Sequence, residues 1–426
     1  MHLNRNEKIN QITEKTLVIG IDIAKSSHFA CATDDRGREL QKSWQVKQSR
    51  QGFETLHAEI VTLMGRHEKT NVFVGFEPTG HYWMNLASFL EARSIPFLLV
   101  NPLHVKRTKE LEDNLQSKND MKDARLIAKM IPQGHYSIPR IMRPVDQELR
   151  RGSAFRDRLR KDKGSVLNRI RRWFDLYFPE FSAVFKEVGV QAKAILRLVP
   201  LPGDVLNLGS EAILQTIRAQ QVKALGPDKI DKLYQAASIS IYCSDSPEMA
   251  RKEIYFLLDQ LDMFETQIDE VTRNLIELAK ELPDFQYLRT VQGISETTVA
   301  ELLAETGSLK LYDNPRQLIK LAGLTLTAQE SGDMKGRKKL SKRGRKKLRH
   351  LLYKTVFPLI HHNDGFKQLF NYYKDRKDNP LKGKEAIVVL CSKILKIFHG
   401  LSHKETVFDS DRMIQDLPFL SQQLAA

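Results

Sequence analysis

The feature that most constrains the fold is a hydrophobic repeat in the second half of the chain. Nine apolar residues alternate spacings of three and four, namely Ile254, Leu257, Leu261, Phe264, Ile268, Val271, Leu275, Leu278 and Leu282. This alternation is typical of a coiled coil over about four heptads, and an ordinary core helix rarely keeps it so long. Pro283 ends the pattern. The stripe therefore needs a partner helix, either within the chain or in a second copy.

A strongly basic helix is predicted before this repeat, over residues 146–174. Leu159, Val166, Ile170 and Phe174 can form an apolar seam, while arginines and lysines cover the other faces. We consider this helix one candidate partner for the coiled-coil stripe.

The N-terminal part of the chain has a different pattern, that of an α/β domain. Apolar runs predict strands over 16–22, 28–34, 39–46, 71–77 and 95–100, and helical spacing predicts helices over 50–66 and 81–93. The first three strands are joined by short turns, which favours an antiparallel meander. The whole order predicts a mixed sheet covered by helices.

Composition limits the class of protein and its partners. A chain of 426 residues is too long for one hydrophobic core, and its net charge of +15 favours a polyanionic partner such as nucleic acid. Three distant cysteines make a disulfide framework or a cysteine zinc site improbable. The N-terminus lacks the apolar core of a signal peptide, and Lys393 and Lys396 interrupt the longest apolar tract, 386–398. We therefore expect a cytoplasmic protein with no membrane partner.

Four acids stand where a metal site could form. Asp22 and Glu77 each end a predicted strand, and Asp120 and Asp123 lie three residues apart on one face of a predicted helix. Carboxylate oxygens on rigid elements suit Mg²⁺ or Mn²⁺, and paired divalent ions promote phosphodiester displacement. Each acid alone also has an ordinary interpretation, as a turn former, a helix cap or a surface ion pair. Taken together, the four favour a metal site.

A dense basic run follows a Ser-Gly pair, Ser331 and Gly332. Ten of the fifteen residues from Lys335 to Arg349 are Lys or Arg. We expect seven of them to contact nucleic acid: Lys335, Arg337, Lys338, Lys339, Lys342, Arg343 and Arg345. From the residues alone, Ser331 is either a turn residue beside phosphate-binding lysines or an activated nucleophile.

These motifs resemble those of a known family. GIDIAK, FEPTGHYW and NDMKDARLIA, followed by QGISETTVAELLAETG, KLAGLTLTAQESG, LSKRGRKKLRHLLY and GKEAI, are similar in order to the DEDD-type insertion-sequence transposases, the IS-one-ten family, related to Piv-type DNA invertases. The resemblance covers roughly 16–175 and 250–402 and is weakest over 180–245, to which we assign no role.

The resemblance implies an N-terminal RuvC-like (RNase H-like) domain whose four acids are Asp22, Glu77, Asp120 and Asp123. It also implies that Ser331 attacks DNA covalently. It implies, too, that the protein is an oligomer in which the serine of one subunit acts with the acids of another. A further implication is a structured non-coding RNA that pairs with donor and target DNA and guides the protein to them. The basic helix, with Arg169, Arg171 and Arg172, is a candidate nucleic-acid surface.

Residues 288–307 resemble a helix-hairpin-helix element, whose turn can face phosphates. Gln292 and Ser295 stand where the family more often has Pro and a second Gly, and Asn119 and Lys122 flank the paired aspartates where Lys-Thr is more usual. The predicted organisation is a tail (1–15), a RuvC-like domain (16–140), a basic-helix and coiled-coil region (141–285), a mostly helical transposase domain (286–402) and a second tail (403–426).

The predicted function is a DNA recombinase that excises and inserts a mobile element with Mg²⁺ (or Mn²⁺) and Ser331. It would bind double-stranded DNA and guide RNA, and assemble as a dimer or tetramer through the coiled coil. The alternatives are a metal-dependent RuvC-type nuclease, in which Ser331 is a turn residue, and a non-catalytic nucleic-acid-binding protein. Mg²⁺ dependence and a covalent DNA–protein link discriminate among the three.

Overall fold

The computed structural model describes residues 4–78, 80–112, 120–139, 143–222, 225–243, 245–327, 330–331, 334–335 and 339–414. The chain divides into two compact units, Met1–Ile141 and Met142–Ala426, and each is described by itself.

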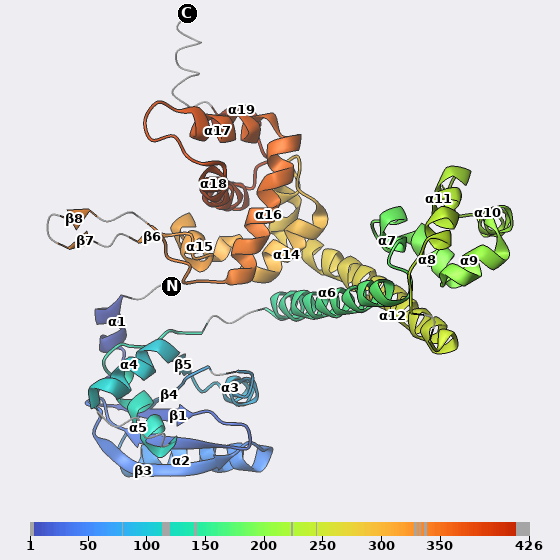
Figure 1. The fold of residues 1–426 in the computed structure, drawn as a ribbon. Coiled ribbons are helices and arrows are strands. Elements are labelled where there is room, and N and C mark those ends of the chain that lie inside the picture. Colours follow the sequence, from blue (N-terminus) through green and yellow to red (C-terminus); the bar gives the residue numbers. More distant parts are fainter. Residues whose placement is uncertain are drawn as a thin grey trace, which may run out of the picture. The chain divides into compact units, whose positions relative to one another are not determined.

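The N-terminal unit is built on a five-stranded mixed sheet with strand order β3-β2-β1-β4-β5 (Figure 1). Its strands are β1 (Thr16–Asp22), β2 (Ser27–Thr33), β3 (Glu39–Lys47), β4 (Asn71–Phe76) and β5 (Phe97–Leu99). The first three form an antiparallel meander, whereas β4 runs parallel to β1 and β5 parallel to β4. The predicted mixed α/β domain is confirmed.

Five helices accompany this sheet: α1 (Arg5–Asn10), α2 (Arg50–Arg66), α3 (Trp83–Ala92), α4 (Pro102–Glu112) and α5 (Asp120–Met130). Strand β1 is buried on both faces because its side chains alternate between two cores. Leu17, Ile19 and Ile21 pack with residues of α2 and α3. Val18 packs with residues of α5 on the other face. This two-sided cover explains why TLVIGID is apolar at nearly every position.

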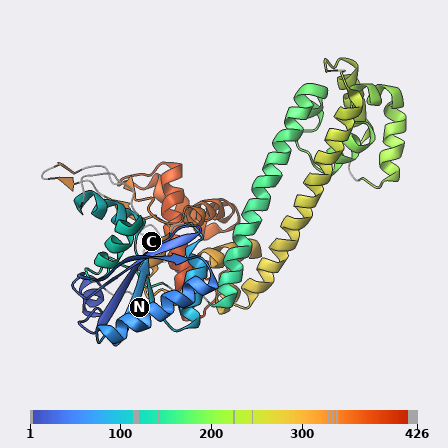
Figure 2. The ribbon, with the colours of Figure 1, turned by 90° about the horizontal axis from the view of Figure 1, so that it is seen from below.

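The C-terminal unit contains two long antiparallel helices, α6 (Pro144–Tyr177) and α12 (Pro247–Lys280), which we call the stem; Figures 1 and 2 show them side by side. Gly152 lies against Leu275, because a Cβ on Gly152 would stand 2.9 Å from the Leu275 Cδ2 atom. At the other end, the Trp173 indole N–H donates to the Ala250 carbonyl at 2.9 Å. The coiled-coil stripe of α12 thus packs on the basic helix of the same chain.

Residues 178–246, which join the two stem helices, form a small helical bundle that we call the tip. It consists of α7 (Phe181–Val184), α8 (Val190–Leu198), α9 (Pro202–Leu208), α10 (Ser210–Ala219) and α11 (Pro227–Ser238). Its core is continuous with that of the neighbouring stem, including Trp173, Phe174, Ile254 and Leu258. The segment without an assigned role is therefore a folded part of the unit.

The other end of the stem enters the base, a helical domain over residues 283–414. The base contains α13 (Pro283–Leu288), α14 (Glu296–Thr306), η1 (Leu309–Leu311), α15 (Pro315–Leu321), α16 (Lys346–His362), α17 (Asp364–Asp375), α18 (Gly383–Lys404) and α19 (Ser410–Ile414). By length and composition α18 could cross a membrane, yet 56% of its most apolar stretch is buried, and Leu390, Ile394 and Phe398 lie in the core of the base. The predicted mostly helical C-terminal region is confirmed.

A narrow antiparallel ribbon, the arm, projects from the base between α15 and α16 (Figure 1). Its four short strands are β6 (Leu326–Thr327), β7 (Glu330–Ser331), β8 (Met334–Lys335) and β9 (Lys339–Leu340). Strand β6 pairs with β9 and β7 pairs with β8, so the chain runs out along one strand and returns along the other.

Candidate metal site and nucleic-acid surfaces

Two of the predicted acids stand at the same edge of the sheet. Asp22 is the last residue of β1, and Glu77 directly follows β4. These strands are parallel neighbours, with Ile21 opposite Phe76, so the next residue on each strand is an acid. The carboxyl ends of parallel strands meet at one edge, which is where functional groups gather in such sheets.

Helix α5 brings Asp123 to this edge. A Cβ on Gly20 would stand 2.7 Å from the Ala128 Cα atom and would also collide with the Ala124 carbonyl, so α5 lies directly on β1. The Met121 carbonyl in the first turn of α5 accepts from Ser43 in the middle of β3, and Arg125, one turn later, pairs with Glu39 at the start of β3. Strands β3 and β1 run in the same direction, so the helix runs antiparallel to both. Its first turn is consequently at the Asp22 end. Only glycine permits this close approach.

The carboxylate of Asp123 is nearly buried, with 8% of the residue exposed, and it forms an ion pair with the Lys109 ammonium group of α4. Asp120 begins α5, but its side chain lies outside the described residues. Within the described part of the chain, no three His, Cys, Asp or Glu side chains converge closely enough to enclose a metal ion. The donor set nevertheless suits Mg²⁺, since hard cations prefer carboxylate oxygens.

His28 supports this edge and was not predicted. Its Nδ1 atom accepts from the Ala24 amide at 3.2 Å, so the proton is on Nε2, which donates to the Gln48 side chain. The ring therefore holds the turn that follows Asp22. Burial lowers the pKa of His28 below its ordinary value of 6.5, which keeps the imidazole neutral. A single histidine inside a strand carries no sequence signal for such a role.

The arm presents Ser331 at its far end. Ser331 pairs with Met334, and Glu330 with Lys335, next to the point where the chain reverses. The side chains of Ser331 and Lys335, and the whole of Arg337 and Lys338, lie outside the described residues. Among the other predicted contacts, Lys339, Lys342 and Arg343 are exposed.

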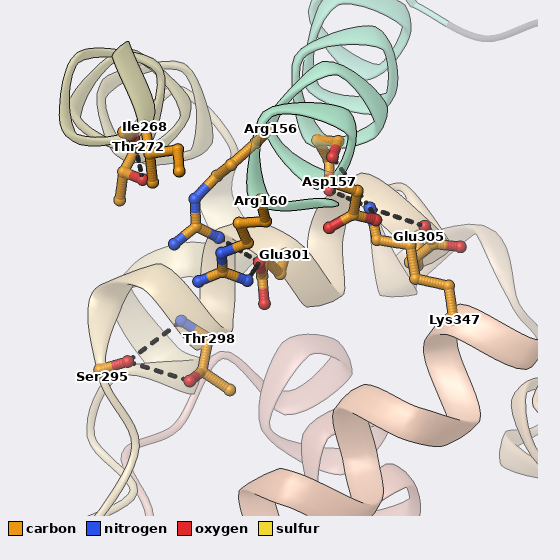
Figure 3. Close-up of polar contacts among 11 residues, drawn as sticks. Arg156, Asp157, Arg160, Ile268, Thr272, Ser295, Thr298, Glu301, Glu305 and Lys347 are labelled. Carbon is orange, nitrogen blue, oxygen red and sulfur yellow. Dashed lines mark hydrogen bonds and ion pairs between the residues drawn. The ribbon is translucent and has the colours of Figure 1, made fainter. Parts of the chain in front are cut away.

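The last part of the basic run is anchored in the base. Arg345 donates to the Glu305 carbonyl, and Arg349 donates to the Ala322 carbonyl at 2.9 Å. The Lys347 ammonium group lies 2.7 Å from both the Asp157 carboxylate and the Ser153 hydroxyl of α6, as Figure 3 illustrates for the acid pair. These cations link the start of α16 to α14 and to the stem. The density of Lys and Arg in the sequence could not distinguish these anchored cations from their exposed neighbours.

A second ionic contact joins the stem to the base (Figure 3). Glu301 of α14 accepts from Arg156 of α6 and, at 3.3 Å, from Arg160. Arg156 is only 4% exposed, and burial lowers its pKa, opposed by the Glu301 charge. Its Nε–H group has no hydrogen-bond partner within the described residues. The pair therefore joins the stem to the base beside the contacts of Lys347.

Over 288–307, where two helices joined by a turn are predicted, α13 ends at Leu288, residues 289–295 form a turn, and α14 follows. Ser295 caps α14, because its hydroxyl accepts from the Thr298 amide at 3.2 Å (Figure 3). Gly293 has φ of +94° and packs against α16, where a Cβ would stand 3.3 Å from the Pro358 carbonyl oxygen. The serine hence occupies one amide that a phosphate could otherwise use.

The predicted stem cations are exposed. Arg169 donates to the Gln260 side chain at 3.3 Å and Arg171 to that of Asn168 at 3.0 Å, and Arg172 is also exposed. Among the described residues none of the three forms an ion pair with a carboxylate. Their charges are thus available to a polyanion.

Two transposase family models match the chain. A DEDD transposase model matches residues 19–179, and a model of the IS116/IS110/IS902 transposase family matches residues 285–371. The chain belongs to the IS110 family of DEDD transposases. The first match contains Asp22, Glu77 and Asp123, and the second contains the arm. Residues 180–284 lie between the two matches.

Two insertion-sequence proteins are similar to the chain over most of their length. A transposase for the insertion sequence element IS1111A of Coxiella burnetii is 23% identical over 349 residues, covering 81% of this chain and 78% of that protein. The mini-circle putative transposase for IS117 of Streptomyces coelicolor is 24% identical over 331 residues, covering 74% and 78%.

One solved structure that resembles part of the chain is T. thermophilus RuvC in complex with a Holliday junction substrate. It shows 16% identity and a TM-score of 0.20, covering 27% of this chain and 90% of that one. The predicted α/β class of the N-terminal domain is confirmed by the mixed sheet described above, and the DEDD family match covers this domain.

Proposed function

We propose that this transposase excises and inserts a mobile DNA element by strand transfer, with Asp22, Glu77, Asp120 and Asp123 as metal ligands and Ser331 as nucleophile. The observation that carries the proposal is the arrival of Asp22, Glu77 and the first turn of α5 at one edge of the sheet. Carboxylates drawn from distant segments repel one another, and a divalent cation is the usual compensation.

The four acids would hold Mg²⁺ or Mn²⁺, and the bound ion would stabilise the charge that develops at the reacting phosphate. Asp22 and Glu77 lie on adjacent strands and cannot separate without breaking the sheet. Asp123 has to turn away from Lys109 to join them. The rigid strands thus set the geometry, and the helical acid completes it.

Ser331 would supply the covalent step. Its Oγ atom attacks phosphorus, an Oγ–P bond forms, and a P–O bond to a deoxyribose oxygen breaks. The serine proton passes to a base and the departing oxygen takes up a proton, so the bond energy is retained in the phosphoserine link. The position of Ser331 at the end of a narrow ribbon supports this role, because a projecting arm can reach into a bound duplex.

The proposed partners are donor and target double-stranded DNA and a structured guide RNA. Lys335, Arg337, Lys338, Lys339, Lys342 and Arg343 would contact backbone phosphates, and so would Arg169, Arg171 and Arg172. Arg345 would contribute mainly by ordering the arm, since it is bonded to Glu305. Each phosphate contact that is lost should reduce the slope of log affinity against log salt by about 0.9 for duplex DNA.

We also propose that the protein acts as an oligomer in the cytoplasm, on the nucleoid of a bacterial or archaeal cell. The family resemblance implies that serine and acids come from different subunits. The two ends of the coiled-coil stripe are largely buried within the chain (Ile254, Leu257, Leu261, Leu275 and Leu282), and Phe264, Ile268, Val271 and Leu278 are half-buried. Contacts between subunits therefore have to use other surfaces as well.

The competing function is a metal-dependent nuclease in which Ser331 is only a turn residue. Amplification of the excised circular junction from cells carrying the element distinguishes the two. We expect Asp123→Asn and Ser331→Ala each to abolish the circle, at matched protein levels. Asp378→Asn and Ser182→Ala, at exposed positions elsewhere, serve as controls that retain it.

Circles formed by Ser331→Ala, but not by Asp123→Asn, would support the nuclease-type chemistry. A protein–DNA adduct that survives denaturation, that is lost with Ser331→Ala and that persists with the control Ser182→Ala would support the covalent route.

A further inference from the structure

The tip differs in charge from the remainder of the chain. Residues 178–246 contain seven Lys or Arg and seven Asp or Glu, whereas the whole protein carries a net charge of +15. The tip also lies between the two family matches. A neutral surface on a strongly basic protein is poorly suited to a polyanion, but it is where two copies can approach without net repulsion.

An apolar knob projects from the tip just after α11. Ile239 is 74% exposed and Ile241 is 88% exposed, which is unusual for two large aliphatic side chains so close together. The segment is held in place, because Ser240 donates to the Glu180 carboxylate. Glu180 and the exposed Asp245 give the surroundings of the knob an acidic character.

A shallow groove of about 790 Å³ lies at the other end of α11. Val184, Phe185, Val190 and Val222 supply its apolar lining, and its charged lining residues are Lys186, Lys229 and Glu187. The Lys229 ammonium group lies 4.5 Å over the Phe185 ring and donates to the Gln191 side chain at 2.9 Å. The groove is therefore apolar with a border of two lysines and one glutamate, whose net positive charge is opposite in sign to the acids beside the knob.

We infer that the tip is a docking surface for a second copy of this chain, with the Ile239–Ile241 knob of each copy seated in the groove of the other. Lys229 lies in the first turn of α11 and Ile239 follows its last residue, so groove and knob are separated by about 15 Å along the helix. Two α11 helices placed antiparallel around a two-fold axis would bring each knob to the opposite groove.

Charge and shape favour the knob of a second copy as the occupant of the groove. The acidic surroundings of the knob face lysines at the groove, and antiparallel helices also place opposite dipole ends together. The inference rests on the oligomer proposed above. It concerns assembly alone, so it can be tested without DNA, RNA or catalysis.

Cysteine crosslinking on the full-length protein provides the test. Cys243 is exposed and lies two residues beyond Ile241, whereas Cys31 and Cys391 are buried. One copy carries Val190→Cys in the groove together with Cys243→Ser. The other is wild type and carries a tag of different size. The mixture is treated with a short bis-maleimide.

We expect a mixed-size dimer joined through residues 190 and 243, identified by peptide mass. Val61→Cys, at an exposed position on α2, replaces Val190→Cys in the control mixture, which should give no such product. Absence of the 190–243 product above this control overturns the inference, and so does a dimer in sedimentation whose crosslinks map elsewhere.

A second variant tests the knob itself. Ile241→Glu should weaken self-association in sedimentation at least about tenfold, because a carboxylate would have to enter an apolar groove. Val407→Glu, at a similarly exposed apolar position in the base, should leave it unchanged. Equal self-association of the two variants would contradict the docking mode. If the protein forms the 190–243 crosslink but does not cleave DNA, the result counts against the proposed reaction and not against docking through the tip.

Discussion

The Lys109 ammonium group on α4 forms an ion pair with the Asp123 carboxylate on α5, at the edge of the sheet where Asp22 and Glu77 also lie. A cation of the protein itself thus competes for one proposed metal ligand. Lys109→Met should therefore strengthen Mn²⁺ binding to the full-length protein, measured by titration calorimetry. The pair is partly exposed and worth up to about 1 kcal/mol, so the gain should be up to about fivefold.

Lys106→Met is the matched control, since Lys106 is an exposed lysine on the same helix. It should leave Mn²⁺ affinity unchanged. Weaker binding by Lys109→Met would mean that Lys109 supports the site and does not compete for it.

Gly20 is expected to be intolerant of any side chain. Gly20→Ala places a methyl group against backbone atoms of Ala124 and Ala128, which cannot rotate away. Helix α5 must then shift from the sheet, at a cost of about 1–3 kcal/mol. Chemical denaturation measures the loss. Gly65→Ala on α2, where a Cβ meets nothing within 4 Å, should be neutral or slightly stabilising. Comparable losses in both variants would contradict the close packing of α5.

The Arg156–Glu301 pair should show strong coupling. Arg156→Met leaves Glu301 in a nearly buried site with only the exposed Arg160 as partner, which should destabilise the C-terminal unit by about 3–5 kcal/mol. The double change Arg156→Met with Glu301→Leu replaces both charges with apolar groups and should recover most of that stability. A double-mutant cycle in denaturant measures the coupling, and additive effects would show that the two charges act independently.

His28 should make the N-terminal unit sensitive to acid. Its pKa is lowered in the folded chain, so the unfolded chain takes up the proton first as pH falls. The stability that depends on neutral His28 is complete above about pH 6.5 and is lost progressively below it. Thermal unfolding between pH 8 and pH 5 should show this slope in wild type and a smaller one in His28→Gln. Identical slopes would assign the acid sensitivity to other groups.

Much of the N-terminal fold is predictable because the information is local. Short apolar runs locate β1, β2 and β4, and the short turns specify the meander. The position of α5 is not predictable in this way, since it depends on Gly20, and a single glycine in an apolar strand has several possible roles. The ion-pair partner of Asp123 cannot be predicted from the sequence either, because Lys109 belongs to a neighbouring helix whose packing the sequence pattern does not specify.

In the C-terminal unit, the periodicity of Ile254 to Leu282 indicates a paired helix but does not name the partner. The choice between α6 and a second copy is decided by folding of the tip, which brings Trp173 beside Ala250. Likewise, the basic run is visible in sequence, yet the division between exposed Lys339 and anchored Lys347 depends on carboxylates of α6 and α14.

The close approach of Trp173 and Ala250 has a consequence for how this protein can vary. Helix α6 ends and α12 begins at nearly the same place. The tip is therefore inserted between these two helices as a separate module. Such a module can be lengthened, shortened or exchanged without changing the path of α6 and α12 into the base. Cores at the two ends of the stem can then diverge at different rates, so the docking surface inferred for the tip can evolve separately from the base.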